Sequence, residues 1–141
     1  MSLSLPTRQD RLLAIRARID AHGGGAAHVY ALPVAASPES AAEASPLAIL
    51  VLPVPCGDIG STPEGLATLT LDLEGAVGYA AVAGQAAWVR FVDGAGTAVY
   101  DAEAGLPGSG KPVILTDGKT PPTTNLFVGG EVQLASAVWV E

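Results

Sequence analysis

The segment that most restricts the fold is AAWVRFVDGAGTAVYDAE, residues 86–103. It contains two runs rich in β-branched and aromatic residues, the classes that favour strands. The four residues between these runs, Asp93 to Gly96, are of the kind that turns one strand back along another. The segment therefore predicts a β-hairpin, and it is the strongest local signal in the chain.

Two further runs predict strands with different surroundings. LAILVL at 47–52 is apolar throughout, which is typical of a strand buried on both faces. LATLTLDLE at 66–74 alternates between apolar and polar residues and predicts a half-buried strand. Its inner face is expected to carry Leu69, Leu71 and Leu73.

Three more runs complete the expected sheet: HVYAL at 28–32, PVILT at 112–116 and EVQLASAVWVE at 131–141. The inward residues expected in the last run are Val132, Leu134, Val138 and Val140. The total is seven short strands, and the 17 Gly and 11 Pro of the chain supply turns between them. We expect a mainly β fold, an antiparallel β-sandwich or jelly-roll-like barrel with one N-terminal α-helix.

Residues 7–21, TRQDRLLAIRARIDA, have the one clear helical pattern. Leu12, Ile15 and Ile19 recur at steps of three and four residues and form an apolar stripe. Thr7 followed by Asp10 resembles a capping box at the start, and Gly23 to Gly25 are expected to end the helix. We therefore expect residues 1–25 to form a helix with a glycine linker, and residues 26–141 to form the β-sandwich domain.

The narrow stripe must be buried either on the chain's own sandwich or on a partner. Residues 1–20 hold four arginines, which give the stripe a polar rim that suits an acidic partner, and this favours docking. The candidate partner-binding residues are Arg8, Arg11, Leu12, Ile15, Arg16 and Ile19.

The charge balance argues against nucleic acid as a partner. The net charge is −7, and residues 1–20 contribute +2 from four arginines and two aspartates, so the remainder carries −9. Phosphate contact needs a basic face, which this chain lacks outside the helix. The longest apolar run, PLAILVLPVP, is too short to cross a bilayer, and the N-terminus lacks the apolar core of a signal peptide. We expect a soluble protein made in the cytoplasm, without a membrane partner.

GLPGSGKP at 105–112 has the glycine and lysine spacing of a phosphate-binding loop up to its last position. There Pro112 replaces the hydroxyl that would hold magnesium, and it has no N–H to offer a phosphate. The residues that follow reach turn signals too soon for a helix to start at Lys111. The segment predicts a loop between two strands, and we expect no cofactor.

The remaining candidates for chemistry are few. His22 and His28 have only Asp20 as a neighbouring ligand type, so we expect no metal site. Cys56, the only cysteine, is expected to be an ordinary thiol; a hydrolytic enzyme would require Cys56 and His28 to meet.

Four carboxylates gather around the hairpin in the sequence: Asp93, Asp101, Glu103 and Asp117. They lack the spacing of a calcium loop and fall at turns and strand ends. Because no stretch of the sequence offers a catalytic constellation, we expect a protein that is not an enzyme.

Three segments resemble a family of small tailed-phage and prophage structural proteins. AWVRFVDGAGTAVYDAE at 87–103 is similar to that family's aromatic-Arg-aliphatic strand, Asp-Gly hairpin and T-x-V-x-D strand. The helix ending in Ile19-Asp20, followed by small residues and the strand HVYALP, looks like the family's opening. FVGGEVQLASAVWVE at 127–141 looks like its final strand, and the Pro-rich loops at 33–46 and 105–112 depart from the pattern.

This resemblance implies a virion component, either a head-decoration or a tail-associated protein. Its partners would be copies of itself in a homo-oligomer, other virion proteins, or both, and its location would be the assembled virion. The alternative is a β-sandwich that binds carbohydrate or another small ligand through exposed aromatic residues. The tyrosines and tryptophans available for that role are Tyr30, Tyr79, Trp88, Tyr100 and Trp139.

Overall fold

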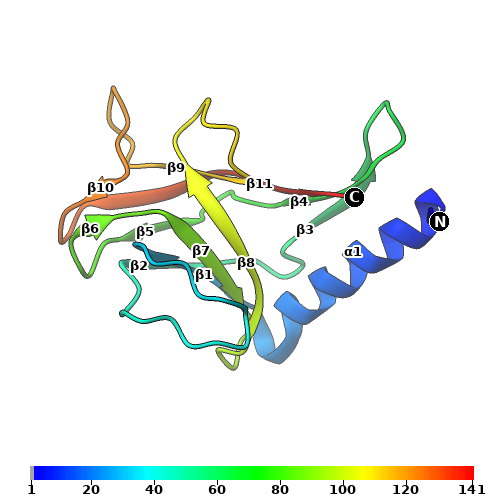
Figure 1. Ribbon diagram of the computed structural model, residues 1–141, viewed down its shortest axis with the longest axis horizontal. Helices are drawn as coiled ribbons and strands as arrows, with labels where there is room; N and C mark the ends of the chain where they lie inside the picture. Colours follow the sequence, from blue (N-terminus) through cyan, green and yellow to red (C-terminus); the bar gives the residue numbers. More distant parts are fainter. Residues whose placement is uncertain (1) are drawn as a thin grey trace.

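The computed structural model describes residues 2–141, which form one α-helix, one short 3-10 helix and eleven strands (Figure 1). The helices are α1 (Leu5–Asp20) and η1 (Ala21–Gly23). The strands are β1 (Ala26–Tyr30), β2 (Ala48–Val51), β3 (Gly57–Ser61), β4 (Ala67–Leu71), β5 (Val77–Tyr79), β6 (Gly84–Gln85), β7 (Trp88–Val92), β8 (Ala98–Gly105), β9 (Val113–Thr116), β10 (Asn125–Leu126) and β11 (Glu131–Val140).

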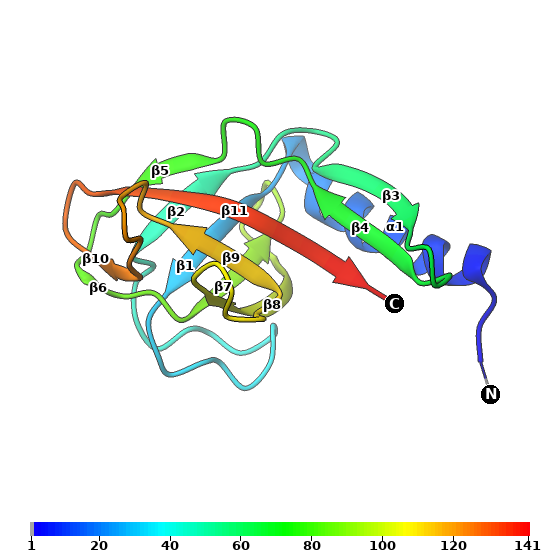
Figure 2. The same ribbon diagram turned by 90° about the horizontal axis from the view of Figure 1, so that it is seen from above.

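The main sheet curls into a barrel-like body. Its strand order is β2-β1-β7-β8-β9-β11-β4-β3. Strand β5 lies off this path and pairs with the first residues of β11. Every pairing is antiparallel except that of β8 with β9. The sheet closes where β5 lies beside β2, and the N–H of Ala81 donates to the carbonyl of Leu47 at 2.8 Å (Figure 2). The mainly β fold with an N-terminal helix is thus confirmed.

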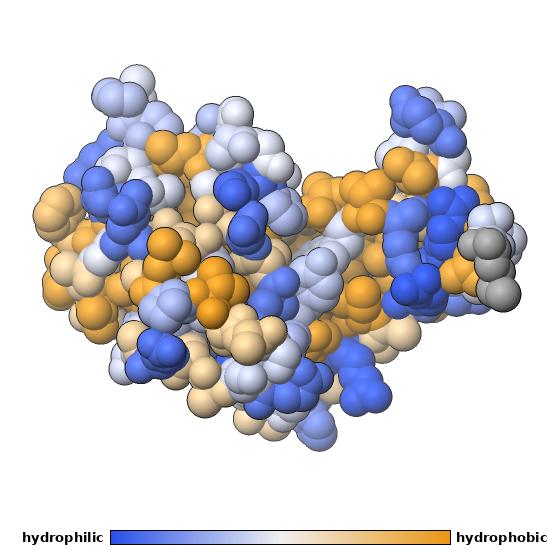
Figure 3. Space-filling model, in the orientation of Figure 1, coloured by the Kyte–Doolittle hydropathy of each residue, from blue (hydrophilic) through white to orange (hydrophobic). Residues whose placement is uncertain are grey.

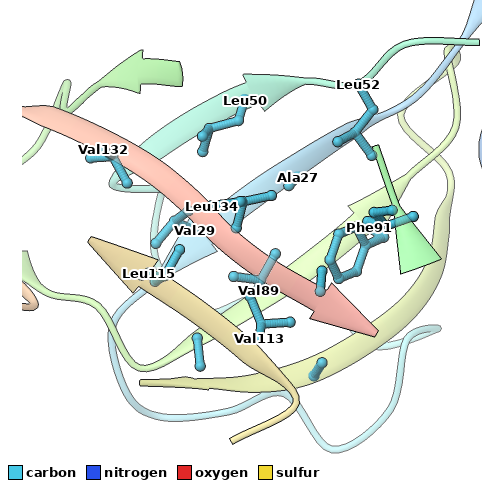
Figure 4. Packing of buried hydrophobic residues seen from close by; sticks show 14 of the residues in the cluster. Ala27, Val29, Leu50, Leu52, Val89, Phe91, Val113, Leu115, Val132 and Leu134 are labelled. Carbon is cyan, nitrogen blue, oxygen red and sulfur yellow. The ribbon is translucent and has the colours of Figure 1, made fainter. Parts of the chain in front are cut away.

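The core fills the inside of this body. Side chains from β1, β2, β7, β9 and β11 point toward one another in Figure 4, among them Val29, Leu50, Phe91 and Leu134. Burial of such side chains supplies the main stabilising free energy of a domain of this size. The predicted hairpin is present as β7 and β8, and its turn is held by Asp93, whose Oδ1 accepts from the N–H groups of Ala95 and Thr97.

Helix α1 starts earlier than predicted. Ser4 is the N-cap, and its side-chain oxygen accepts from the N–H of Thr7 at 3.4 Å, so the expectation that Thr7 caps the helix is wrong. The physical reason is Pro6, which fits the first turn of a helix because the N–H groups there have no partner inside the helix. The helix ends at Asp20, and η1 carries the chain to Gly23, close to the predicted end.

Two strand predictions are corrected. In β2, Leu50 faces the core but Ile49 and Val51 face outward, so this strand is not buried on both faces. In β11, Val132 and Leu134 point inward as predicted, whereas Val140 is exposed and Val138 only partly buried. The pairing of β11 with β9 shifts register between Leu134 and Ser136, and one extra residue at such a bulge reverses which side chains face the core. The inward residues of its second half are Ala137 and Trp139.

Candidate interaction surface

Six large apolar side chains on the outside of the barrel-like body form one surface, which we call the apolar face. Its members are Ile49 and Val51 of β2, Val77 and Tyr79 of β5, and Phe127 and Val128 of the turn before β11. Their exposed fractions range from 41% for Val77 to 73% for Val51. The largest exposed apolar surface of a protein is often a site of interaction.

The fold brings these six residues together from three parts of the sequence. Strand alternation turns Ile49 and Val51 outward on β2, and it does the same for Val77 and Tyr79 on β5. The two strands approach closely at Gly78, where an added Cβ would lie 2.9 Å from the carbonyl oxygen of Ile49. The face is therefore continuous across β2 and β5.

The turn that carries Phe127 and Val128 is fixed to the end of β5. The N–H of Ala80 donates to the carbonyl of Gly130 at 2.8 Å, and the N–H of Gly129 donates to the carbonyl of Ala80 at 2.8 Å. These bonds hold the turn beside Ala80, the residue that follows Tyr79. Tyr79 consequently lies between the two β2 residues and the two turn residues.

None of the six members of the apolar face carries a charge, but charged groups adjoin them, and Asp117, Lys119 and Glu131 line a small pocket together with Phe127. On the β11 side, Glu131 pairs with Tyr79 and Gln133 with Val77, and the Gln133 amide donates to the Glu131 carboxylate at 2.6 Å. On the β1 side, His28 is the partner of Ile49. Burial, followed by the positive charge of Arg90, lowers the pKa of His28, so the imidazole is uncharged at physiological pH.

The predicted partner-binding helix makes its contacts within the chain. Leu12 and Ile19 are buried, and α1 packs on β4 and β3. The stripe is therefore buried on the chain's own sheet, which is one of the two alternatives for it. Ile15 is partly buried against the same core. In this conformation Leu12 and Ile19 offer no side-chain surface to a partner, while contact through the exposed parts of the helix stays a prediction.

The arginines of the helix also bind the chain itself. Arg8 donates to the carbonyls of Gly65 and Glu141, both at 3.0 Å, and Arg16 donates to the carbonyl of Gly57 at 3.2 Å. Arg11 forms an ion pair of 2.7 Å with the Glu141 side chain and remains largely exposed. These three arginines thus tie the helix to the segments beside it.

A groove of about 520 Å³ lies where the helix meets the sheet. Its lining includes Ile15 of α1, Tyr100 of β8 and Trp139 of β11, and the two aromatic rings meet edge to face at 5.2 Å. Figure 3 shows hydrophobic residues along this junction between the body and the extension formed by α1, β3 and β4. Trp139 Nε1 is buried without a hydrogen-bond partner, but it has no accessible surface through which a ligand in the groove could reach it.

The loop at 105–112 connects β8 to β9 as expected, and no helix starts at Lys111. The Lys111 ammonium donates to the Glu103 carboxylate at 2.9 Å, so its charge is already paired. A cleft of about 650 Å³ beside the loop is lined mainly by alanine, leucine and valine, with this ion pair at its edge. The arrangement lacks the ring of free N–H groups that cradles a phosphate at a helix N-terminus.

The thiol and the histidines do not form a reactive centre in the described part of the chain. Cys56 is buried, and its N–H donates to Asp20 Oδ1 at 2.9 Å. Burial, followed by the negative charge of Asp20, raises the pKa of the Cys56 thiol to about 12, which opposes thiolate formation. His22 lies 3.9 Å from Asp93, and His28 lies beside Arg90 on the neighbouring strand.

The carboxylates near the hairpin have structural partners. Asp101 forms a bidentate pair with Arg90 at 2.8 and 3.0 Å, and Arg90 also donates to the carbonyl of Ser37, which holds the 33–46 loop against the body. Asp117 accepts from the N–H groups of Lys119 and Thr123 within its own turn. Among residues 2–141, no group of three or more metal-ligating side chains comes together.

Comparison with protein-family models, curated proteins and solved structures found no match to this chain. Over the described residues, no helix combines the length and the hydrophobicity that crossing a membrane requires. Sequence reasoning missed the apolar face because β5 was not predicted and because LAILVL was assigned to the core on both sides. The signal that could have found it was that same run, whose composition suits burial on two faces.

Proposed function

We propose that this chain is a structural or assembly protein of a phage or prophage particle and acts through protein–protein contacts. The apolar face is the observation that carries the proposal. A surface of six uncharged side chains, two of them aromatic, has the composition of an interface core. The virion setting comes from the resemblance of the hairpin, the opening helix and the final strand to the phage family.

The chemistry of the chain supports a binding role over catalysis. The single thiol is buried and paired with an acidic residue that disfavours the thiolate. The lysine of the glycine-rich loop is engaged in an ion pair at the surface. A particle component needs neither group, because it works by presenting surfaces to its neighbours.

Ligand binding through aromatic side chains stays a prediction with less support. Trp88 and Trp139 are buried in the body, Tyr30 stacks on Trp88 at 4.6 Å, and Tyr100 packs on Trp139. Tyr79 is the exposed member of the five, and it lies on the apolar face. The aromatic residues therefore favour a protein partner for this surface.

The proposal is tested by particle association. A strain that carries the gene within a prophage is induced, and the particles are purified on a density gradient and probed for the chain. We expect the chain in the particle band, and we expect Val51→Glu to be lost from it. Leu66→Glu changes an exposed leucine in the turn between β3 and β4 and should remain. Absence of the wild-type chain from purified particles would overturn the proposal.

A further inference from the structure

We infer that the apolar face binds a second copy of this chain, forming a dimer with two-fold symmetry. The inference rests on the proposed function and identifies the partner of the same surface. In a two-fold interface the same patch is used on both copies, so the patch must be complementary to itself. Three observations on the apolar face support the inference.

The first observation is the composition of β2. LAILVL is the pattern of a strand buried on both faces, yet the monomer covers only the face that carries Leu50. Ile49 is 50% exposed and Val51 is 73% exposed. Packing of a second copy against the outer side would give both residues the surroundings that their sequence pattern predicts.

The second observation is the size of the surface. Taking about 200 Å² for an aromatic side chain and about 100 Å² for an aliphatic one, the exposed fractions leave roughly 500 Å² of apolar side chain uncovered. A standard interface buries about 800 Å² on each partner, and a homodimer interface is about 65% apolar, which is roughly 520 Å². The apolar face alone supplies the apolar share of such an interface.

The third observation is the placement of charge. The chain carries a net charge of −7, so most surfaces of two copies would repel each other. The six members of the apolar face carry no charge, although the Glu131 carboxylate adjoins Tyr79 and Phe127 and accepts from the Gln133 amide. Two copies that meet through these six residues therefore bring uncharged side chains together.

The position of Tyr79 gives the inference a specific geometry. It lies between the β2 residues and the turn residues of the apolar face, so a two-fold axis through the centre of the face passes near it. Each substitution on the face enters the interface twice, once from each copy. A charge placed at Val51 would consequently appear on both sides of an uncharged contact.

The test is the solution mass of the purified chain, measured by sedimentation equilibrium from low to high micromolar concentration. We expect wild type to have twice the monomer mass of 14.1 kDa. Val51→Glu should raise the dimer dissociation constant at least about 100-fold, because unpaired charges are costly in an apolar contact. Tyr79→Ala should raise it about 10-fold or more, in keeping with a central aromatic residue. Leu66→Glu is the matched control and should leave it unchanged.

Circular dichroism and a thermal melt establish that each variant is folded. If Val51→Glu does not fold, Tyr79→Ala decides the question, since Tyr79 is largely exposed and its truncation removes no core contact. A wild-type chain that is monomeric throughout, or an oligomer of another order, would overturn the inference. So would a dimer unaffected by both substitutions. A monomer that still enters particles in a Val51-dependent way would overturn the self-association alone and leave the proposed function standing.

Discussion

The packing of α1 on its own sheet can be tested at Ile19, which has no exposed surface. Ile19→Ala removes three carbon atoms from a buried position, and at about 0.8 kcal/mol for each the lost transfer free energy is about 2.4 kcal/mol. The cavity left behind adds to this, so the free energy of unfolding should fall by about 2–5 kcal/mol. If the helix were instead a free docking element, its apolar stripe would contribute little to the stability of the monomer.

Urea denaturation followed by circular dichroism measures this loss. With a denaturant slope of about 2 kcal/mol/M, the midpoint should fall by roughly 1–2.5 M with an unchanged slope. Leu13→Ala is the matched control on the same helix, because Leu13 is 41% exposed and should lower the free energy of unfolding by less than about 1 kcal/mol. A midpoint for Ile19→Ala that equals that of Leu13→Ala would refute the burial of the helix stripe against the chain's own body.

Two further predictions concern the candidate chemical groups. Iodoacetamide should modify Cys56 very slowly in the native chain up to about pH 9 and rapidly in urea, since a thiol with a pKa of about 12 remains protonated in the fold. The unfolded thiol titrates near 8.5, so native stability should decline as the pH rises from about 9 toward 12, and Cys56→Ala should flatten that decline. Fast native labelling near neutral pH would contradict this. Lys111→Ala should alter the free energy of unfolding by less than about 1 kcal/mol, as expected for an exposed ion pair, and equilibrium dialysis should detect no ATP binding by either form.

The elements that the sequence predicted well are those with local causes. The hairpin of β7 and β8 depends on neighbouring residues, with an Asp-Gly turn between two runs of strand-forming side chains. The stripe of α1 depends on helical spacing, and its buried members are two of the three residues chosen for it. Patterns of this kind need no knowledge of what lies across the fold.

The elements that were missed depend on partners distant in the sequence. β3 reads GDIGS, which has no strand pattern, and it exists because it pairs along β4. The bulge in β11 is set by its register with β9, and this register decides that Trp139 rather than Val140 enters the core. Tertiary pairing of this type overrides local propensity.

The candidate site shows the same division between local and long-range causes. Arginine-rich helices are read as surfaces for partners, yet Arg8 and Arg16 here donate to carbonyls at least 41 residues away in the sequence. No local pattern announces such contacts. The apolar face likewise depends on three segments meeting, and only the composition of β2 pointed toward it.

The seam between β2 and β5 bears on the contact proposed for the apolar face. An apolar strand with an open edge invites uncontrolled pairing with other chains. Here the edge of β2 is covered by the chain itself, because Gly78 allows β5 to approach and the carbonyl of Leu47 accepts from Ala81. Ile49 and Val51 still point outward, so the face remains available while the edge does not. A surface whose edge is closed and whose face is open favours one defined face-to-face contact over extension of the sheet, and the proposed assembly role requires a contact of that kind.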